Sequence, residues 1–105
     1  MALFTPTRTS TDDLARALDP STPKSELVGL AAHRDIAVRA VVASRIDAPM
    51  ASLISLTHDR EARVREALAV NPASPLWVVR TLAEDSRPEI RIRALARLRV
   101  LDRVA

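Results

Sequence analysis

The chain has 105 residues, 48% of them apolar, with one glycine, no cysteine and a formal net charge of +3. The length predicts a single domain, the absence of cysteine excludes disulfides and thiolate metal sites, and the single glycine disfavours hairpins and phosphate-binding glycine loops. No apolar run reaches the roughly 20 residues that span a membrane, and the first residues lack a signal-peptide pattern, so we expect a cytoplasmic protein.

In chain order, residues 1–10 are expected to form a flexible N-terminal segment and residues 11–105 a single domain. Alanine, leucine, arginine and glutamate dominate this domain, and all four favour helix. Prolines and polar corners interrupt the apolar pattern at short intervals, which predicts many short helices. These helices are predicted at 11–18, 23–31, 36–44, 49–57, 62–70, 75–83 and 88–99. The expected class is therefore all-α, with about seven short helices.

The predicted helix starts carry recognisable residues. Pro23, Pro49 and Pro75 suit a first helical turn, where the missing N–H needs no partner. Small polar residues at the starts can accept a hydrogen bond from a free backbone N–H. The residues predicted to cap helices in this way are Thr22, Ser74, Asp35, Asp59 and Ser86.

The same pattern recurs every 26 residues, as the spacing of Pro23, Pro49 and Pro75 shows. Leucine returns at the same interval at positions 30, 56 and 82, and arginine at positions 39, 65 and 91. Each unit holds two short helices that are marginal alone and must bury their apolar faces against the next unit. About three such units therefore predict a stacked helical solenoid.

Three segments carry a family resemblance: LAAHRDIAVRAVVASRIDAP, LTHDREARVREALAVNPASP and LAEDSRPEIRIRAL. They resemble leucine-rich repeat variant repeats, which belong with the HEAT-like helical repeats, over roughly residues 14–98. The resemblance implies a short right-handed α-solenoid. It also implies a ladder of Arg–carboxylate pairs that fixes the register of neighbouring units. The residues expected to build this ladder are Arg39, Asp59, Arg65, Asp85 and Arg91.

Nothing in the sequence points to catalysis, a metal or a cofactor. The two histidines, His33 and His58, are too few for a metal site and are expected to be solvated residues at helix corners. There is no Walker or Rossmann loop and no convincing nucleophile–base set. The chain is therefore expected not to be an enzyme and to bind no cofactor.

Two functions remain open at this point. Helical solenoids commonly bind proteins through extended surfaces, which favours a non-catalytic protein–protein interaction module with an unknown protein partner. Trp77 is either a half-exposed filler or an interface anchor. The alternative is electrostatic nucleic-acid binding by the last helix, because residues 87–105 hold six arginines against two acidic residues. Those arginines equally suit a polar cap on the stack. An end-to-end homodimer is also expected to be accessible, since a stack has two ends. The candidate partner-binding residues are Trp77, Arg91, Arg93, Arg97 and Arg99.

Overall fold

The computed structural model describes residues 8–104, which form helices and contain no strand. The all-α class and the seven helices expected from the sequence are confirmed for this part of the chain. The first seven residues of the segment predicted as flexible, 1–10, lie outside the described residues, whereas Ser10 already belongs to the first helix. The helices are α1 Ser10–Leu18, α2 Lys24–Leu30, α3 Ile36–Ser44, α4 Met50–Thr57, α5 Ala62–Val70, α6 Leu76–Leu82 and α7 Pro88–Val104.

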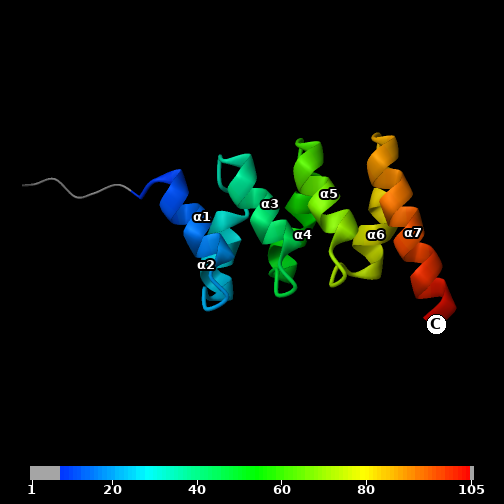
Figure 1. Cartoon of the computed structure of the whole chain (residues 1–105), viewed down its shortest axis with the longest axis horizontal. Coiled ribbons are helices and arrows are strands. Elements are labelled where there is room, and N and C mark those ends of the chain that lie inside the picture. Colours follow the sequence, from blue (N-terminus) through cyan, green and yellow to red (C-terminus); the bar gives the residue numbers. More distant parts are fainter. Residues whose placement is uncertain (1–7, 105) are drawn as a thin grey trace, which may run out of the picture.

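The helices form two rows (Figure 1). Helices α1, α3, α5 and α7 stand side by side in chain order, and each contacts the next. Helices α2, α4 and α6 form the second row, in which α4 contacts α6. Each helix of the second row also packs against the helix that follows it in the chain. Since successive helix pairs contact mainly their neighbours, the molecule is an elongated row of pairs.

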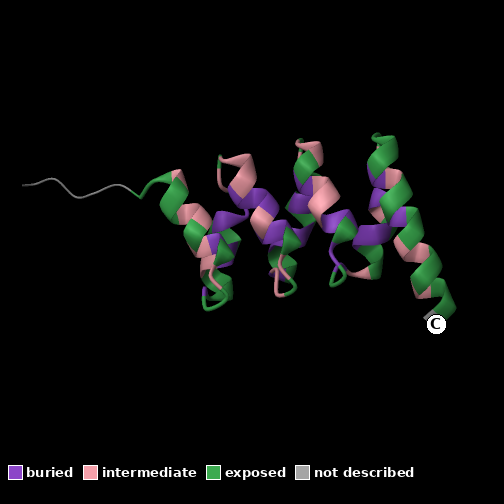
Figure 2. Ribbon diagram, viewed as in Figure 1, coloured by how far each residue is buried: buried purple, intermediate pink, exposed green. Residues whose placement is uncertain are grey.

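The core lies between the two rows, where buried residues concentrate (Figure 2). Many of its members recur at the 26-residue interval, and three of these positions keep a buried apolar residue in all three units from α2 to α7. Burying a side chain of this size contributes roughly 1.5–3 kcal/mol. The buried residues of successive helix pairs belong to one hydrophobic cluster. The three sets are Val38, Val64 and Ile90; Leu27, Leu53 and Val79; and Leu30, Leu56 and Leu82.

Helix α7 is longer than expected. The sequence predicted an end near residue 99, but the helix continues to Val104. The earlier second helices, α3 and α5, end where a proline follows within a few residues, as Pro49 and Pro72 do. No proline follows Pro88, so nothing in the backbone interrupts α7.

The predicted caps Thr22 and Ser74 are wrong. The N-cap positions of α2 and α6 are held by Pro23 and Pro75 themselves, without a side-chain hydrogen bond. The Thr22 hydroxyl instead donates to the Arg16 carbonyl at 2.6 Å, and that of Ser74 to the Leu68 carbonyl at 2.7 Å. The last carbonyls of a helix lack intrahelical donors, so these buried hydroxyls satisfy the end of the preceding helix.

The predicted caps of the following helices are partly right. Asp35 caps α3 and accepts from the Ala37 N–H at 2.9 Å. The N-cap of α5 is Glu61, whereas Asp59 stands two residues earlier and accepts the Glu61 N–H at 3.0 Å. Before α7, the predicted cap was Ser86. Instead Asp85, one residue earlier, accepts the backbone N–H of the residue two positions after it. The aspartates of these corners therefore order the turn before the helix.

None of the helices between residues 8 and 104 is both long enough and apolar enough to cross a lipid bilayer.

Candidate functional site

Arg39 and Arg65 join successive helix pairs through two-point ion pairs. Arg39 donates from Nε to Asp59 Oδ2 at 2.8 Å and from Nη2 to Oδ1 at 3.2 Å. Arg65 repeats this geometry on Asp85, at 2.8 and 3.2 Å. Each carboxylate belongs to the unit after its arginine, 20 residues along the chain. A planar guanidinium held at two points fixes orientation as well as distance, so these pairs set the register between units.

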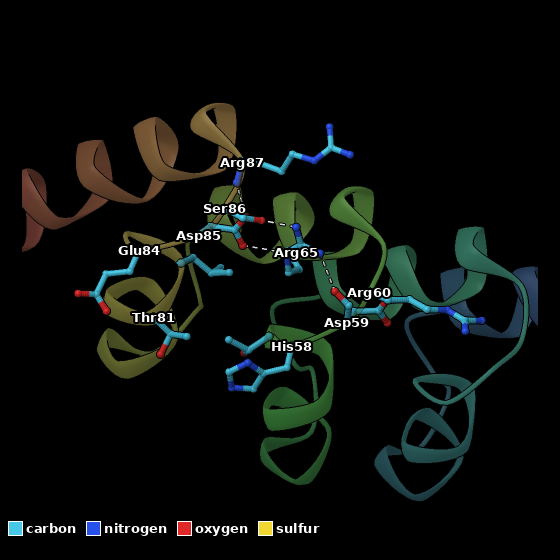
Figure 3. Close-up of a pocket in the computed structure, with 11 residues that line it drawn as sticks. His58, Asp59, Arg60, Arg65, Thr81, Glu84, Asp85, Ser86 and Arg87 are labelled. Atoms are coloured by element: carbon cyan, nitrogen blue, oxygen red, sulfur yellow. Dashed lines mark hydrogen bonds and ion pairs between the residues drawn. The ribbon is translucent and has the colours of Figure 1, made fainter.

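Asp59 and Arg65 are six residues apart in the sequence, as are Asp85 and Arg91, and this spacing reflects a backbone contact rather than an ion pair. Arg65 Nη1 donates to the backbone carbonyl of Asp59, six residues earlier, at 2.7 Å. Arg91 makes the same bond to the Asp85 carbonyl at 2.7 Å. Figure 3 shows the Arg65 guanidinium lying between Asp59 and Asp85. Arg39, which donates to the His33 carbonyl at 2.8 Å, and Arg65 therefore each tie the corner of their own unit to the corner of the next.

The ladder carboxylates are held in their charged form. Burial raises the pKa of Asp59, but hydrogen bonds from Arg39 and from the Glu61 N–H outweigh it, and the net pKa is lowered. The same balance lowers the pKa of Asp85, with burial opposed by Arg65 and a backbone N–H. The carboxylates in turn raise the pKa of both arginines. The ladder is therefore ionised at neutral pH.

Acid should weaken this ladder. A carboxyl whose pKa is lower in the folded than in the unfolded state stabilises the fold above its unfolded pKa of about 3.9, and this contribution is lost as the pH falls through the folded pKa. The free energy of unfolding, measured by denaturant titration between about pH 2 and pH 6, should fall on the acid side. Asp59→Asn should flatten that fall, and Glu89→Gln, at an exposed site, should not. An equal slope in wild type and Asp59→Asn would contradict the assignment.

In the first pair of the ladder, the acidic residue and the nitrogen-bearing residue have exchanged positions. His33 stands in the register of Asp59, and Asp13 stands in the register of Arg39. His33 Nε2 lies 2.9 Å from Asp13 Oδ2, and both side chains are 16% exposed. Because Nδ1 already accepts the Asp35 N–H at 2.9 Å, Nε2 carries the proton. The expectation of a solvated His33 is therefore wrong, whereas His58 is exposed.

A second set of cross-unit bonds was not predicted from the sequence. Arg45 Nη1 donates to the carbonyls of Ala17 and Asp19 at 2.7 and 2.9 Å. Asn71, in the same register one unit later, donates from Nδ2 to the carbonyls of Ala43 and Arg45 at 2.9 Å each. The next residue in this register, Arg97, donates to the Pro72 carbonyl at 2.8 Å. The 26-residue spacing of these three donors was the available signal.

Asn71→Asp should test this second set. The carboxylate keeps the shape of the amide but cannot donate to the two carbonyls, which then face a buried negative charge. Removing such buried hydrogen bonds costs roughly 1–3 kcal/mol, so the free energy of unfolding should fall by about that amount. Ser44→Ala, an exposed change at the end of α3, is the control. Equal stability of Asn71→Asp and wild type in denaturant titration would refute this role.

The arginines predicted to bind a partner are mostly engaged within the chain. Arg91 donates to the Asp85 carbonyl, Arg97 to the Pro72 carbonyl, and Arg93 pairs with Glu66 at 3.2 Å on the surface. Arg99 is exposed on α7. Three of the four predicted arginines therefore have acceptors within the chain, and two of the four, Arg93 and Arg99, are exposed.

Trp77 lies on the first helix of its unit, within an exposed apolar surface. We call this surface the apolar face: Val28 of α2, Met50 and Ile54 of α4, and Leu76 and Trp77 of α6. Met50 and Ile54 are each 63% exposed, and Trp77 is 40% exposed. The exposed positions between Met50 and Ser55 include no charged residue. Sequence reasoning missed Met50 and Ile54, although Met50 shares the register of Leu76 and Ile54 that of Val28.

A polar hollow of about 600 Å³ lies between the corners that precede α5 and α7 (Figure 3). One wall is the ladder itself, with Asp59, Arg65 and Asp85, and His58 and Glu84 lie toward the other side. Its two aspartates are already bound by ladder arginines. Within residues 8–104 no cluster of three or more His, Cys, Asp or Glu is placed to hold a metal ion. The hollow is therefore a polar recess formed by the joint between two units.

Comparison of the chain with protein-family models, curated proteins and solved structures found no match.

Proposed function

We propose that the chain is a short right-handed α-solenoid of the leucine-rich repeat variant and HEAT-like type, and that it serves as a non-catalytic protein–protein interaction module. The repeat assignment is supported by the two recurring sets of cross-unit bonds at the 26-residue register. The partner binds the apolar face of α2, α4 and α6. A large exposed apolar patch on a small protein typically marks an interaction site.

The observation that carries this proposal is the exposure of Met50, Ile54 and Trp77 on neighbouring helices. Helices α4 and α6 pack together, and both carry exposed apolar side chains. Tryptophan is enriched among the residues that dominate binding energy, and methionine adapts its shape to a partner. The partner is therefore a protein that presents apolar side chains to this face.

A site-specific photo-crosslinker at position 54 tests the proposal. A partner bound to the apolar face should be captured from position 54 and not from position 63, an exposed site on α5 in the other row. Trp77→Ala should reduce capture by about 30-fold or more if Trp77 is a dominant contact. Trp77 is the only tryptophan, so its emission should shift to shorter wavelength when the purified partner binds. Equal capture from both positions would contradict the proposal.

The alternative, nucleic-acid binding by α7, has weaker support because Arg91, Arg93 and Arg97 already contact acceptors in the chain. Labelled duplex DNA and RNA should bind weakly and with a shallow salt dependence in fluorescence anisotropy. An affinity loss of about a thousandfold between roughly 50 and 200 mM salt, typical of six or more phosphate contacts, would favour the alternative instead. Arg93→Glu/Arg97→Glu should then abolish that binding.

A further inference from the structure

The two ends of the helical row differ in chemistry. In α1, Asp12 occupies the register that holds Val38, Val64 and Ile90 in later units, and Asp12 is exposed. Arg16 occupies the register of the buried Val42 and Leu68 and binds Glu26 at two points, 2.7 and 2.9 Å. Charged residues at otherwise apolar positions are what an end facing water requires. Among the described residues, the α1 end is therefore a polar cap.

The outward face of α7 lacks such a cap. Ile92, which is 66% exposed, stands in the register of Ala40, which is 8% exposed, and of Glu66, whose side chain is 44% exposed. Leu95 stands in the register of Ala43 and Ala69, which are fully buried, yet Leu95 is 46% exposed. The α7 face thus presents Leu95 where its equivalents are fully buried, with the exposed Ile92 beside it on the same helix.

Arg91 is set in the ladder geometry on this same face. Like Arg65, it donates from Nη1 to the carbonyl six residues earlier. Arg65 directs its remaining donors to the carboxylate of the next unit. No carboxylate among the described residues pairs with Arg91. Its guanidinium is therefore held in position for a carboxylate supplied from outside the unit.

We propose that the α7 face binds a second copy of this chain, in an antiparallel α7–α7 dimer with two-fold symmetry. A head-to-tail stack is disfavoured because it would place Ile92 and Leu95 against the charged α1 cap. In α7, the residues at 91, 92, 95, 99 and 102 lie on one side of the helix, given 3.6 residues per turn. An antiparallel pair places Arg91 of each copy opposite Asp102 of the other, with Leu95 near the centre. The exposed Arg99 lies at the edge, where it can stay hydrated.

Sedimentation equilibrium of the full chain, over a concentration series reaching the millimolar range, tests this dimer. The interface is small, so a weak, reversible monomer–dimer equilibrium is expected. Ile92→Glu and Leu95→Glu should each weaken the dimer by about 30-fold or more. Val100→Glu is the matched control, since Val100 is 53% exposed on the opposite side of the same helix. Circular dichroism at low concentration should show that all three variants fold, because the substituted side chains are exposed.

Exchanging the charges of Arg91 and Asp102 tests whether the two α7 helices pair in the antiparallel direction. Asp102→Arg should weaken the dimer by placing two arginines together, and Arg91→Asp/Asp102→Arg should restore it. A strict monomer at all concentrations would overturn the proposal, and so would open-ended oligomers, which head-to-tail contacts produce. Failure of the exchange to restore the dimer would overturn the antiparallel pairing. Because these residues lie outside the apolar face of α2, α4 and α6, partner capture from position 54 tests the proposed function separately.

Discussion

Arg65→Ala is expected to lower the free energy of unfolding by about 3 kcal/mol or more. The substitution leaves the Asp85 carboxylate, 6% exposed, without the guanidinium that compensates its charge. It also leaves the Asp59 carbonyl without its 2.7 Å donor. Breaking one partner of a buried ion pair is costly because the remaining charge is neither paired nor hydrated. Denaturant unfolding followed by circular dichroism measures the change.

Two comparisons separate the ladder contribution from other effects of the Arg65 substitution. Arg63→Ala, an exposed change on the same helix, should alter stability little. Arg65→Lys keeps the charge but loses the two-point geometry, so its stability should fall between wild type and Arg65→Ala. A stability of Arg65→Ala close to that of Arg63→Ala would mean that the ladder does not hold the units together.

Leu68→Ala is expected to destabilise the protein by about 3 kcal/mol. Leu68 is fully buried in α5, the helix that contacts both α3 and α7. Its removal leaves a cavity between units, and the loss combines the transfer of the side chain from water with the empty volume. The midpoint and slope of denaturant unfolding give this value if the transition is two-state.

The matched control is Val100→Ala, in which the side chain is 53% exposed on α7. Alanine has a higher helix propensity than valine, so this variant should be as stable as wild type or slightly more stable. A small effect of Leu68→Ala, comparable with that of Val100→Ala, would show that the joint between α3, α5 and α7 is not the core of the molecule.

Much of the fold could be predicted from the sequence because the same pattern of prolines and apolar residues recurs in each unit. Prolines at 23, 49 and 75 mark the helix starts, and the apolar positions recur with them, so the seven helices could be placed within a few residues. The end of α7 was placed too early, near residue 99, because no proline or polar corner marks it in the sequence. Thr22 and Ser74 were misassigned because a hydroxyl near a helix start can also reach the carbonyls of the preceding helix, and sequence spacing does not distinguish the two.

The cross-unit bonds were harder to predict because they depend on how the units stack. The spacing of six residues between Asp59 and Arg65 is visible in one unit, but Arg65 binds the side chain of Asp85, in the next. The reversed rung between Asp13 and His33 follows the same register with different residue types. Arg45 and Asn71 perform one task with different side chains. The bonds between units are therefore defined by a position that recurs in the repeat, and not by one residue type.

The candidate site depends on exposure, which the repeat pattern gives only in part. Trp77 was singled out in the sequence as either a half-exposed filler or an interface anchor. Met50 and Ile54 looked like ordinary apolar positions until the fold placed them on the outer side of α4. The arginines of α7 appeared as one charged cluster in the sequence, whereas the fold gives three of them acceptors within the chain.

The central claim is that an arginine of one unit and an aspartate of the next hold the stack in register. A double-mutant cycle on Arg65 and Asp85 tests it most directly, with unfolding free energies measured for wild type, Arg65→Ala, Asp85→Ala and the double variant. Contacting residues of this kind couple by about 0.5–3 kcal/mol, and the geometry of this pair predicts a value in the upper part of that range. A coupling energy indistinguishable from zero would contradict the claim.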